Sequence, residues 1–514
     1  MTNPVMTAIP DLSHDLSRKN TSNLFILAKI VEISKDASKL PCVSFPNFVP
    51  SAHRKSYNTV SMKYSWSKTV FPIAAIFSFR MLGLFLLIPV FTLYAANLEG
   101  ATPTLIGLAL GGYGLTQGLL QMPFGMLSDK LGRKPIITLG LILFAAGSLL
   151  GALSESIYSM ILARTLQGTG AIGSVLIALL ADLTPDEQRT KAMAVIGMTI
   201  GTSFSLAMVI SPALSHHYGL AGIFYFTTVL VVFGIVLLHL VIPTPAKERF
   251  HSDSETNPHL FKSVLGNYHL LRLNLGIFCQ HFILTATFFA IPMILSEQMK
   301  QGHLTHQWHF YLPLMLCSFI LMIPFIILAE KKRLMKTVFI GSVLTTVIAQ
   351  ALLAFTYSHW LSLCLLMFAY FVVFNILEAS LPSLVSKQAN PSNKGTAMGV
   401  YSTGQFLGIF AGGSIAGVLY QWHNSEAIFI ANALFAAVWL AVACFMKPNN
   451  YLSTLILNYP SSNAHSEEDL QTLVNVPGIK EVVLAKEEEV LYLRIDRELY
   501  SPGSAERALD AMST

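Results

Sequence analysis

Long apolar runs are the feature that most constrains what this sequence can fold into. From Phe71 onward twelve such runs follow one another. Each is about 20 residues long, the length of an α-helix that crosses a bilayer. The runs lie near residues 71–94, 103–127, 135–153, 157–181, 191–214, 221–242, 272–295, 307–329, 336–355, 360–385, 395–420 and 424–446. The sequence therefore predicts an all-α polytopic membrane protein with twelve transmembrane helices.

The composition agrees with a chain that is solvated mostly by lipid. Only 12% of the residues are charged and 53% are hydrophobic, whereas soluble domains carry about a quarter charged residues. The five cysteines show no paired spacing, so we expect neither a disulfide nor a metal site. No pattern for a nucleophile, a metal cluster or a phosphate-binding loop is present. We therefore expect no enzyme activity, no cofactor and no nucleic-acid partner.

Lysine and arginine residues predict the orientation of the helices. They gather in alternate connections between the apolar runs, and the other set of connections carries Lys300 alone. Because basic residues concentrate on the cytoplasmic side of membrane proteins, this asymmetry predicts that both termini are cytoplasmic. The basic residues of the first set are Lys130, Arg133, Lys134, Arg189, Lys191, Lys247, Arg249, Lys262, Lys331, Lys332, Arg333, Lys387 and Lys394.

Charge and proline content divide the chain into five segments. For the polar N-terminal extension we expect either a disordered cytoplasmic tail or a natural start at Met62. The longest internal connection separates six runs from six, and Ala192–Val195 resembles Ala397–Val400. We therefore expect two six-helix repeats with a substrate path between them. The predicted segments are the extension 1–61, the first half 62–242, the cytoplasmic linker 243–270, the second half 271–447 and a cytoplasmic C-terminal domain 448–514.

The C-terminal segment has the pattern of a small α+β domain. Its apolar and β-branched runs predict the order strand, helix, strand, strand, helix (βαββα), which is typical of a ferredoxin-like fold. No cysteine follows Cys444, so a metal-carrying role is disfavoured. Glutamates outnumber basic residues, and we expect the domain to dock on the basic cytoplasmic loops. The predicted elements are 451–458, 466–474, 480–485, 490–495 and 504–512.

A short charged hinge, residues Gly125–Pro135, joins the second and third apolar runs. Gly125 permits close approach of a neighbouring helix, and Asp129 precedes Arg133 by one helical turn. The string also contains Gly132 and Lys134. This Gly-x-Leu-x-Asp-Lys-x-Gly-Arg-Lys pattern resembles the loop between helices 2 and 3 of the major facilitator superfamily.

The resemblance assigns roles to residues near the hinge. It implies that Asp182 joins Asp129 and Arg133 in a charge cluster that holds the two halves together when the transporter opens outward. It also implies that Gly125 contacts the eleventh span near Gly395 or Gly399. In this interpretation the gating residues are Gly125, Asp129, Gly132, Arg133, Lys134 and Asp182. The alternative is that Asp182 is a solvated residue at the membrane boundary.

Two further strings resemble motifs of the superfamily. Arg164, Gln167 and Gly168 form an Arg-x-x-Gln-Gly string, similar to the span-four motif that is associated with proton coupling. In the fifth span Gly197, Gly201 and Pro212 resemble the antiporter motif, in which small residues allow close helix contact and proline kinks the helix. Ser211 stands where that motif has a glycine, which weakens the antiporter interpretation.

Polar residues inside the spans are candidates for a substrate cavity, because burying them in lipid costs a few kcal/mol each. Tyr113, Gln117 and Gln121 fall at i, i+4 and i+8 and form one stripe. The alternative is that such a stripe only joins helices by hydrogen bonds. The predicted cavity residues are Arg80, Tyr113, Gln117, Gln121, Gln167, Asn375 and Gln405.

Glu378 and His281 are the sharpest candidates for proton coupling, together with Arg164 and Asp182. A carboxyl removed from water is harder to ionise, so we expect Glu378 to change its protonation near neutral pH. An imidazole also exchanges protons in this range. For His281 the alternative is a neutral side chain that is hydrogen-bonded to a neighbouring helix.

Nearly all of the chain beyond residue 61 resembles proton-driven drug exporters of the superfamily that carry an extra C-terminal domain. The resemblance rests on the hinge, Phe77–Gly83, Gly112–Gln117, Lys394–Thr403 and Gly478–Val482. It implies a monomeric antiporter of the bacterial inner membrane that exchanges protons for hydrophobic or amphipathic compounds. Two alternatives remain: a proton symporter importing a polar nutrient, which Arg80 and Glu378 would suit, and a membrane sensor that transports nothing.

Overall fold

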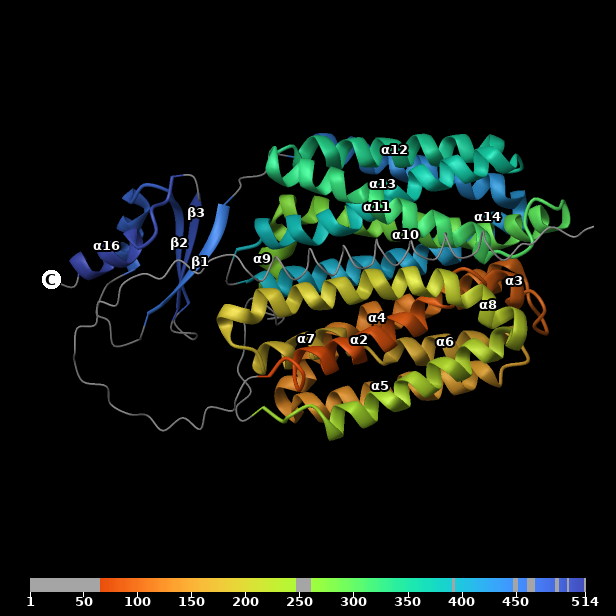
Figure 1. Cartoon of the computed structure of the whole chain (residues 1–514), viewed down its shortest axis with the longest axis horizontal. Coiled ribbons are helices and arrows are strands. Elements are labelled where there is room, and N and C mark those ends of the chain that lie inside the picture. The colour runs from red at the N-terminus through yellow and green to blue at the C-terminus, as the bar shows by residue number, and fades with distance from the viewer. Residues whose placement is uncertain are drawn as a thin grey trace, which may run out of the picture. The chain divides into compact units, whose positions relative to one another are not determined.

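The computed structural model describes residues 65–245, 260–390, 393–446, 452–459, 467–485, 490–496 and 499–512. The predicted extension 1–61, the alternative start at Met62 and half of the linker 243–270 (residues 246–259) lie outside these residues. The helices of the membrane part, drawn in Figure 1, are α2 (Val70–Phe85), α3 (Phe91–Ala95), α4 (Pro103–Leu131), α5 (Arg133–Ala152), α6 (Ile157–Thr169), α7 (Gly173–Asp182), α8 (Asp186–Leu240), α9 (Phe261–Gly266), α10 (Tyr268–Lys300), α11 (Trp308–Lys331), α12 (Met335–Thr356), α13 (Trp360–Gln388) and α14 (Lys394–Cys444).

Most of these helices are long and apolar enough to cross a membrane. Within the described residues eight satisfy both criteria, when α6 and α7 are taken together. Two of the eight, α8 and α14, have about double length, and each is broken by a residue with positive φ: Gly219 (φ 64°) and Asn424 (φ 61°). Ten of the predicted apolar runs coincide with one helix or with one side of such a break, and the other two, 71–94 and 157–181, are each divided between two helices. The chain therefore forms a mostly helical membrane fold.

Two runs that the sequence predicts as continuous helices are interrupted. The run 157–181 is divided between Thr169 and Gly173. Gly170 lies so close to α5 that a Cβ there would be 2.5 Å from the Gly140 carbonyl oxygen. The run 71–94 is divided between Phe85 and Phe91, and Pro89 in this interval has no N–H to continue a helix. The length and hydropathy of the runs predicted helices, but these quantities carry no information about a close contact with another helix or about a missing N–H group.

A residue with positive φ lies in the corresponding connection of each half. Gly132, with φ 94° and ψ 151°, ends α4 and precedes α5. In the second half Arg333 has φ 55° in the connection from α11 to α12. A residue with a Cβ pays roughly 1–2 kcal/mol for a left-handed conformation, whereas glycine does not. The basic string Lys331–Arg333 therefore adopts positive φ in this connection without a glycine.

Glycines allow α4 and α14 to pack backbone against backbone. A Cβ at Gly107 would lie 2.3 Å from the Gly413 carbonyl oxygen, and one at Gly114 would lie 2.5 Å from that of Phe406. Farther along α4, Gly118 faces Thr403. The helices are thus antiparallel, and the start of α14 lies toward the hinge. We call this side of the bundle the hinge end and the other side the opposite end.

The apolar core differs between the two ends. At the opposite end one cluster of buried residues includes members of both halves, such as Phe91, Phe204, Phe288 and Phe371. Toward the hinge end the buried apolar residues form two further clusters, one almost entirely from the first half and one from the second. Figure 1 shows the same division, with the red-to-yellow helices gathered on one side and the green-to-blue helices on the other. The halves therefore share a core mainly at the opposite end.

The C-terminal domain has the predicted order of elements: β1 (Leu452–Asn458), α15 (Glu467–Gln471) with η3 (Thr472–Asn475), β2 (Ile479–Ala485), β3 (Val490–Asp496) and α16 (Ser504–Met512). Its strands pair antiparallel in the order β1-β3-β2. Leu493 pairs with both Leu455 and Val482, and Leu470 and Ala505 complete the buried core.

One described contact joins this domain to the membrane part. Arg494 of β3 donates through Nη2 to the carbonyl oxygen of Lys387 (2.9 Å) and to that of Ala389, at the C-terminal end of α13. A cation is favoured there because the last carbonyl groups of a helix lack partners. This contact has the opposite polarity to the docking of glutamates on basic loops, which stays a prediction.

We predict that Gly107→Ala lowers the free energy of unfolding by roughly 1–3 kcal/mol, because the new methyl group must push α4 away from α14. Gly197→Ala is the matched control, since no described atom lies within 4 Å of a Cβ at that position. It should leave stability unchanged or raise it by about 0.5–1 kcal/mol. Thermal unfolding of the purified protein in detergent compares the two variants. Equal midpoints would contradict the close α4–α14 contact.

Candidate functional site

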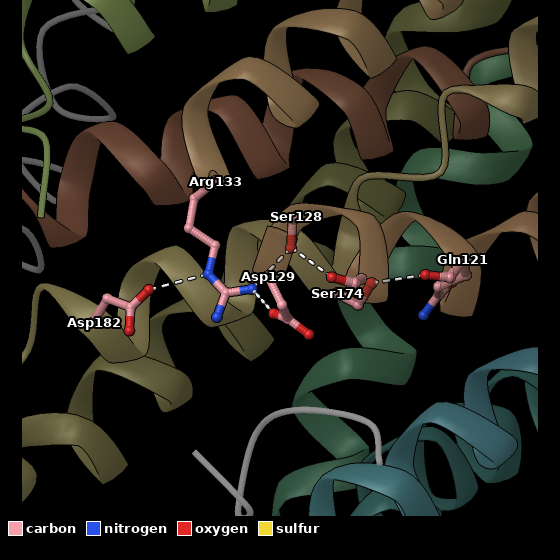
Figure 2. A network of polar contacts seen from close by, with 7 residues as sticks. Gln121, Ser128, Asp129, Arg133, Ser174 and Asp182 are labelled. Atoms are coloured by element: carbon pink, nitrogen blue, oxygen red, sulfur yellow. Dashed lines mark hydrogen bonds and ion pairs between the residues drawn. The ribbon is translucent and has the colours of Figure 1, made fainter. Parts of the chain in front are cut away.

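The hinge residues form a buried charge cluster with the end of α7 (Figure 2). Arg133 donates through Nε to Asp182 Oδ2 at 3.1 Å and through Nη1 to Asp129. The side chains of Arg133 and Asp182 are 2% and 0% exposed, whereas that of Asp129 is 36% exposed. Asp182 is therefore a buried ion-pair partner and not a solvated boundary residue. The predicted cluster of Asp129, Arg133 and Asp182 is present.

Hydroxyl groups extend this cluster along α4. Arg133 also donates to Ser128 Oγ (2.8 Å), and Ser128 donates to the Gly125 carbonyl oxygen (2.6 Å). Ser174 of α7 donates to the Gln121 carbonyl oxygen at 3.0 Å, as Figure 2 shows. These serines tie α4 to α5 and α7. The sequence analysis gave them no role, although both lie beside the motif residues.

Two hinge residues have partners other than those expected. No described residue of α14 lies within 4 Å of a Cβ at Gly125, which faces Ser174 instead. The side of Gly125 on which a side chain would lie therefore faces α7, and the expected contact with Gly395 or Gly399 stays a prediction. Lys134 donates to the Ile242 carbonyl oxygen (2.6 Å) at the end of α8 and so joins α5 to α8.

Glu378 and His281 belong to one polar cluster in the second half. Glu378 of α13 accepts a hydrogen bond from Gln280 Nε2 (2.9 Å), and its Oε2 lies 3.8 Å from His281 Nε2. Gln405 of α14 lies 2.8 Å from the same nitrogen through its Nε2. The Glu378 side chain is 33% exposed and that of His281 is 6% exposed. Residues that the sequence offered as separate candidates are thus neighbours.

The hydrogen bonds of His281 define its neutral tautomer. His281 Nδ1 lies 3.3 Å from the Ile277 carbonyl oxygen, which only accepts hydrogen bonds. Nδ1 therefore carries the proton, and Nε2 accepts from the Gln405 amide. The predicted alternative, a neutral histidine hydrogen-bonded to a neighbouring helix, describes the contact with Gln405 of α14, whereas Ile277 lies one turn earlier in α10 itself. Protonation at Nε2 requires the Gln405 amide to turn its oxygen toward the ring.

A second polar cluster lies in the first half, around Tyr113. Arg80 of α2 donates through Nη2 to the Tyr113 hydroxyl (3.1 Å), and Arg164 of α6 stacks on the same ring with its Cζ 5.0 Å from the centroid. Arg164 also donates to Gln167, which in turn donates to Ser148 Oγ at 2.9 Å. The predicted residues Arg80, Tyr113, Arg164 and Gln167 therefore lie together between α2, α4, α5 and α6.

The other predicted cavity residues do not join either cluster. Gln117 donates to Gln121 at 3.3 Å along α4, and both side chains are buried. Asn375 donates to Ser318 of α11 (3.2 Å) and so joins α13 to α11. For these residues the alternative of interhelical or local hydrogen bonding describes the geometry.

The antiporter-like string of the fifth span is loosely packed at its glycines. Among the described residues nothing lies within 4 Å of a Cβ at Gly197, and the nearest atom to one at Gly201 is 3.8 Å away. Close contact to α2 comes instead from hydroxyl groups: Ser203 lies 2.7 Å from Ser78, and Ser211 donates to the Leu86 carbonyl oxygen. Pro212 lies inside α8 as predicted.

Two features of the membrane part escaped the sequence analysis. Thr287, Gln350 and Asn432 form a fully buried hydrogen-bonded triad in the second half, with bonds of 3.1 Å. Polar residues inside three apolar runs were the available signal. At the opposite end a cavity of about 370 Å³ lies between α8 and the start of α11, and its lining includes His216 and His306.

Comparison with known protein families matches residues 73–376 and 273–471 to the Major Facilitator Superfamily. The chain belongs to the major facilitator superfamily. It is a transporter of this superfamily and not an enzyme. The hinge cluster and the fold are therefore parts of a transport protein.

Relatives of known name cover most of the chain. Inner membrane transport protein YajR of Escherichia coli (strain K12) is 42% identical over 452 residues, which is 88% of this chain and 99% of YajR. Quinolone resistance protein NorA of Staphylococcus aureus is 26% identical over 378 residues, 68% of this chain and 89% of NorA. The crystal structure of the nucleoside transporter NupG has a TM-score of 0.57 at 15% identity and covers 73% of this chain and 99% of NupG. NupG therefore shares the fold.

We predict that Asp182→Asn destabilises the protein more than Asp129→Asn. Removing the fully buried carboxylate leaves Arg133 short of countercharge and should cost on the order of 3–5 kcal/mol of unfolding free energy. The exposed Asp129 should contribute about 1 kcal/mol or less. Unfolding midpoints of both variants against the wild type give the comparison. A larger loss for Asp129→Asn would contradict this assignment of the buried partner.

Proposed function

We propose that this transporter exports hydrophobic or amphipathic compounds in exchange for protons. The observation that carries the proposal is the cluster of Glu378, His281, Gln280 and Gln405. An acidic side chain within a membrane span is expensive, so its presence is by default functional. Here it lies beside an imidazole and has amide neighbours, but no described lysine or arginine forms an ion pair with it. Such a carboxyl gains or loses a proton without breaking an ion pair to a fixed cation.

The amide neighbours serve both protonation states of the cluster. Gln280 donates to Glu378 through Nε2, and its own Oε1 has no hydrogen-bond partner among the described residues. When Glu378 is protonated, rotation of this amide presents an acceptor for the new O–H. Gln405 does the same for His281. Glu378 therefore keeps a hydrogen bond to Gln280 in either of its protonation states. Asp182 remains a further candidate in the coupling path.

We infer alternating access from a difference between the two ends of the bundle: the halves share an apolar cluster mainly at the opposite end. We assign the hinge end and both termini to the cytoplasm, because the basic connections lie there. The described conformation is then closed toward the outside by the shared apolar cluster, while the side of Gly125 on which a Cβ would lie faces Ser174 of α7. When the transporter opens outward, we expect the hinge cluster to contact the start of α14. Protonation must favour one state by several kcal/mol to shift this balance usefully.

The class of cargo and the location rest on the relatives and on the apolar lining. YajR is named an inner membrane transport protein and NorA a quinolone resistance protein, which favours export across a bacterial inner membrane. Phe204 of the first half lies 5.9 Å from Phe374 and 6.4 Å from Phe371 of the second, centroid to centroid. Aromatic side chains at the junction of the halves suit amphipathic cargo. We further propose twelve transmembrane helices, a monomer and a ferredoxin-like C-terminal domain.

We predict that Glu378→Gln abolishes cargo-driven proton release from inside-out vesicles, because the amide carries no titratable proton. A panel of lipophilic cations, zwitterionic quinolones and sugars identifies the cargo that drives release in the wild type. Glu297→Gln is the matched control, since Glu297 is exposed and pairs with Lys300 at 3.2 Å. Proton release that survives Glu378→Gln would move the coupling to another residue. Proton uptake with a sugar would favour import by symport.

A further inference from the structure

Two arginines of the first half are buried without acidic partners. Arg80 is 1% exposed and Arg164 is 2% exposed, and they meet the two sides of one group, the hydroxyl and the ring face of Tyr113. Among the described residues neither guanidinium has a carboxylate within ion-pair distance. The cluster thus holds two positive charges and no negative one.

Most donors of these guanidinium groups are unused. A guanidinium presents five N–H donors. Arg80 donates to Tyr113 and Arg164 donates to Gln167, and the Nε of each has no partner among the described residues. Gly173 begins α7 beside Arg80, and a Cβ there would be in van der Waals contact with Arg80 Nη1 at 3.5 Å. The guanidinium of Arg80 therefore borders a glycine and not a side chain of α7.

The same chain shows how it stabilises a buried arginine when the role is structural. Arg133 is also 2% exposed, and it is bound by two carboxylates and a serine hydroxyl. Leaving a buried charge unpaired is strongly unfavourable. A tyrosine and a glutamine do not supply the missing charge to Arg80 and Arg164. The contrast indicates that their countercharge comes from outside the chain.

We propose that Arg80 and Arg164 bind the acidic group of an amphipathic organic anion or zwitterion. A planar guanidinium matches the two oxygens of a carboxylate or sulfonate, and two such groups around one tyrosine form a receptor for it. The aromatic side chains beside Tyr113, Phe144 and Phe406, each with its ring centroid 6.3 Å from that of Tyr113, suit the apolar part of the ligand. The inference rests on the proposed export of amphipathic compounds and narrows them to those with an acidic group.

The anion site differs in chemistry from the cluster of Glu378 and His281. Its charges are fixed, because arginine stays protonated, whereas Glu378 and His281 titrate. Binding an anion in the first half and a proton in the second therefore uses different residues on different helices, α2 and α6 against α10 and α13. Anion binding can be measured without any proton gradient.

The test uses the purified full-length chain in detergent at constant ionic strength and three matched probes. They are naphthalene-1-carboxylate, its neutral amide and naphthalen-1-ylmethylammonium. Dissociation constants come from ligand-dependent shifts in the unfolding midpoint. We expect the carboxylate to bind at least about 10-fold more tightly than the amide, since hydrogen bonds to charged groups contribute that much or more. Equal affinities, tighter binding of the ammonium probe, or stabilisation by chloride alone would overturn the proposal.

Variants of Arg80 test whether the carboxylate probe binds at this cluster. Arg80→Gln should remove most of the preference for the carboxylate, and Arg80→Lys should retain part of it because the charge remains. Arg272→Gln is the matched control: Arg272 also stacks on a tyrosine, with its Cζ 5.1 Å from the Tyr268 ring, but lies outside the cluster. Should Arg80→Gln fail to fold, Arg80→Lys and the probe series on the wild type still decide. A full preference in Arg80→Lys and Arg80→Gln alike would refute the assignment.

Failure of this inference is distinguishable from failure of the proposed coupling. Glu378→Gln should lose proton release but keep the preference for the carboxylate, since Glu378 is not part of the anion site. Loss of the anion preference in Glu378→Gln would contradict separate sites. Absence of proton release in the wild type, with the preference intact, would remove the coupling and leave the anion site in place.

Discussion

A charge buried in a lipid-solvated bundle needs a partner, and this requirement organises the membrane part of the chain. Arg133 obtains its partners within the protein, and in doing so joins α4, α5 and α7 into one unit at the hinge end. Arg80 and Arg164 obtain only a tyrosine and a glutamine. One arginine is thus committed to holding helices, and the other two retain donors for a ligand. The three arginines are almost equally buried, so a difference in exposure does not explain the difference in their partners.

The two halves differ in the kind of polar group that they bury. The first half places fixed positive charge around Tyr113, whereas the second places a carboxyl, an imidazole and amides around Glu378. Groups of the second kind change their protonation, and groups of the first kind do not. The two halves therefore offer different chemistry: fixed charge in the first, and groups that can exchange protons in the second. The hinge-end connections at Gly132 and at Arg333 both contain a residue with positive φ.

The sequence predicted what depends on local composition and failed where distant helices choose their contacts. Run length gave the helices, and i,i+4 spacing anticipated the pair of Asp129 and Arg133. The break near Gly170 depends on a carbonyl oxygen of another helix, so hydropathy could not reveal it. The same holds for Gly125, because its position beside Ser174 depends on how α4 packs against a distant helix, α7. Glu378 and His281 were recognised singly, but their proximity depends on the relative rotation of α10 and α13, which apolar runs do not encode.

The two ends of the bundle are held by interactions that respond to different physical conditions. The opposite end is closed by apolar and aromatic side chains of both halves, and such contacts weaken on cooling. The hinge end is organised by ion pairs, of which the exposed Asp129 is open to screening by salt and the buried Asp182 is not. Temperature and ionic strength therefore act on opposite sides of the membrane. A change of temperature acts on the apolar closure, whereas a change of salt concentration at the hinge end acts only on Asp129, the exposed member of the charge cluster.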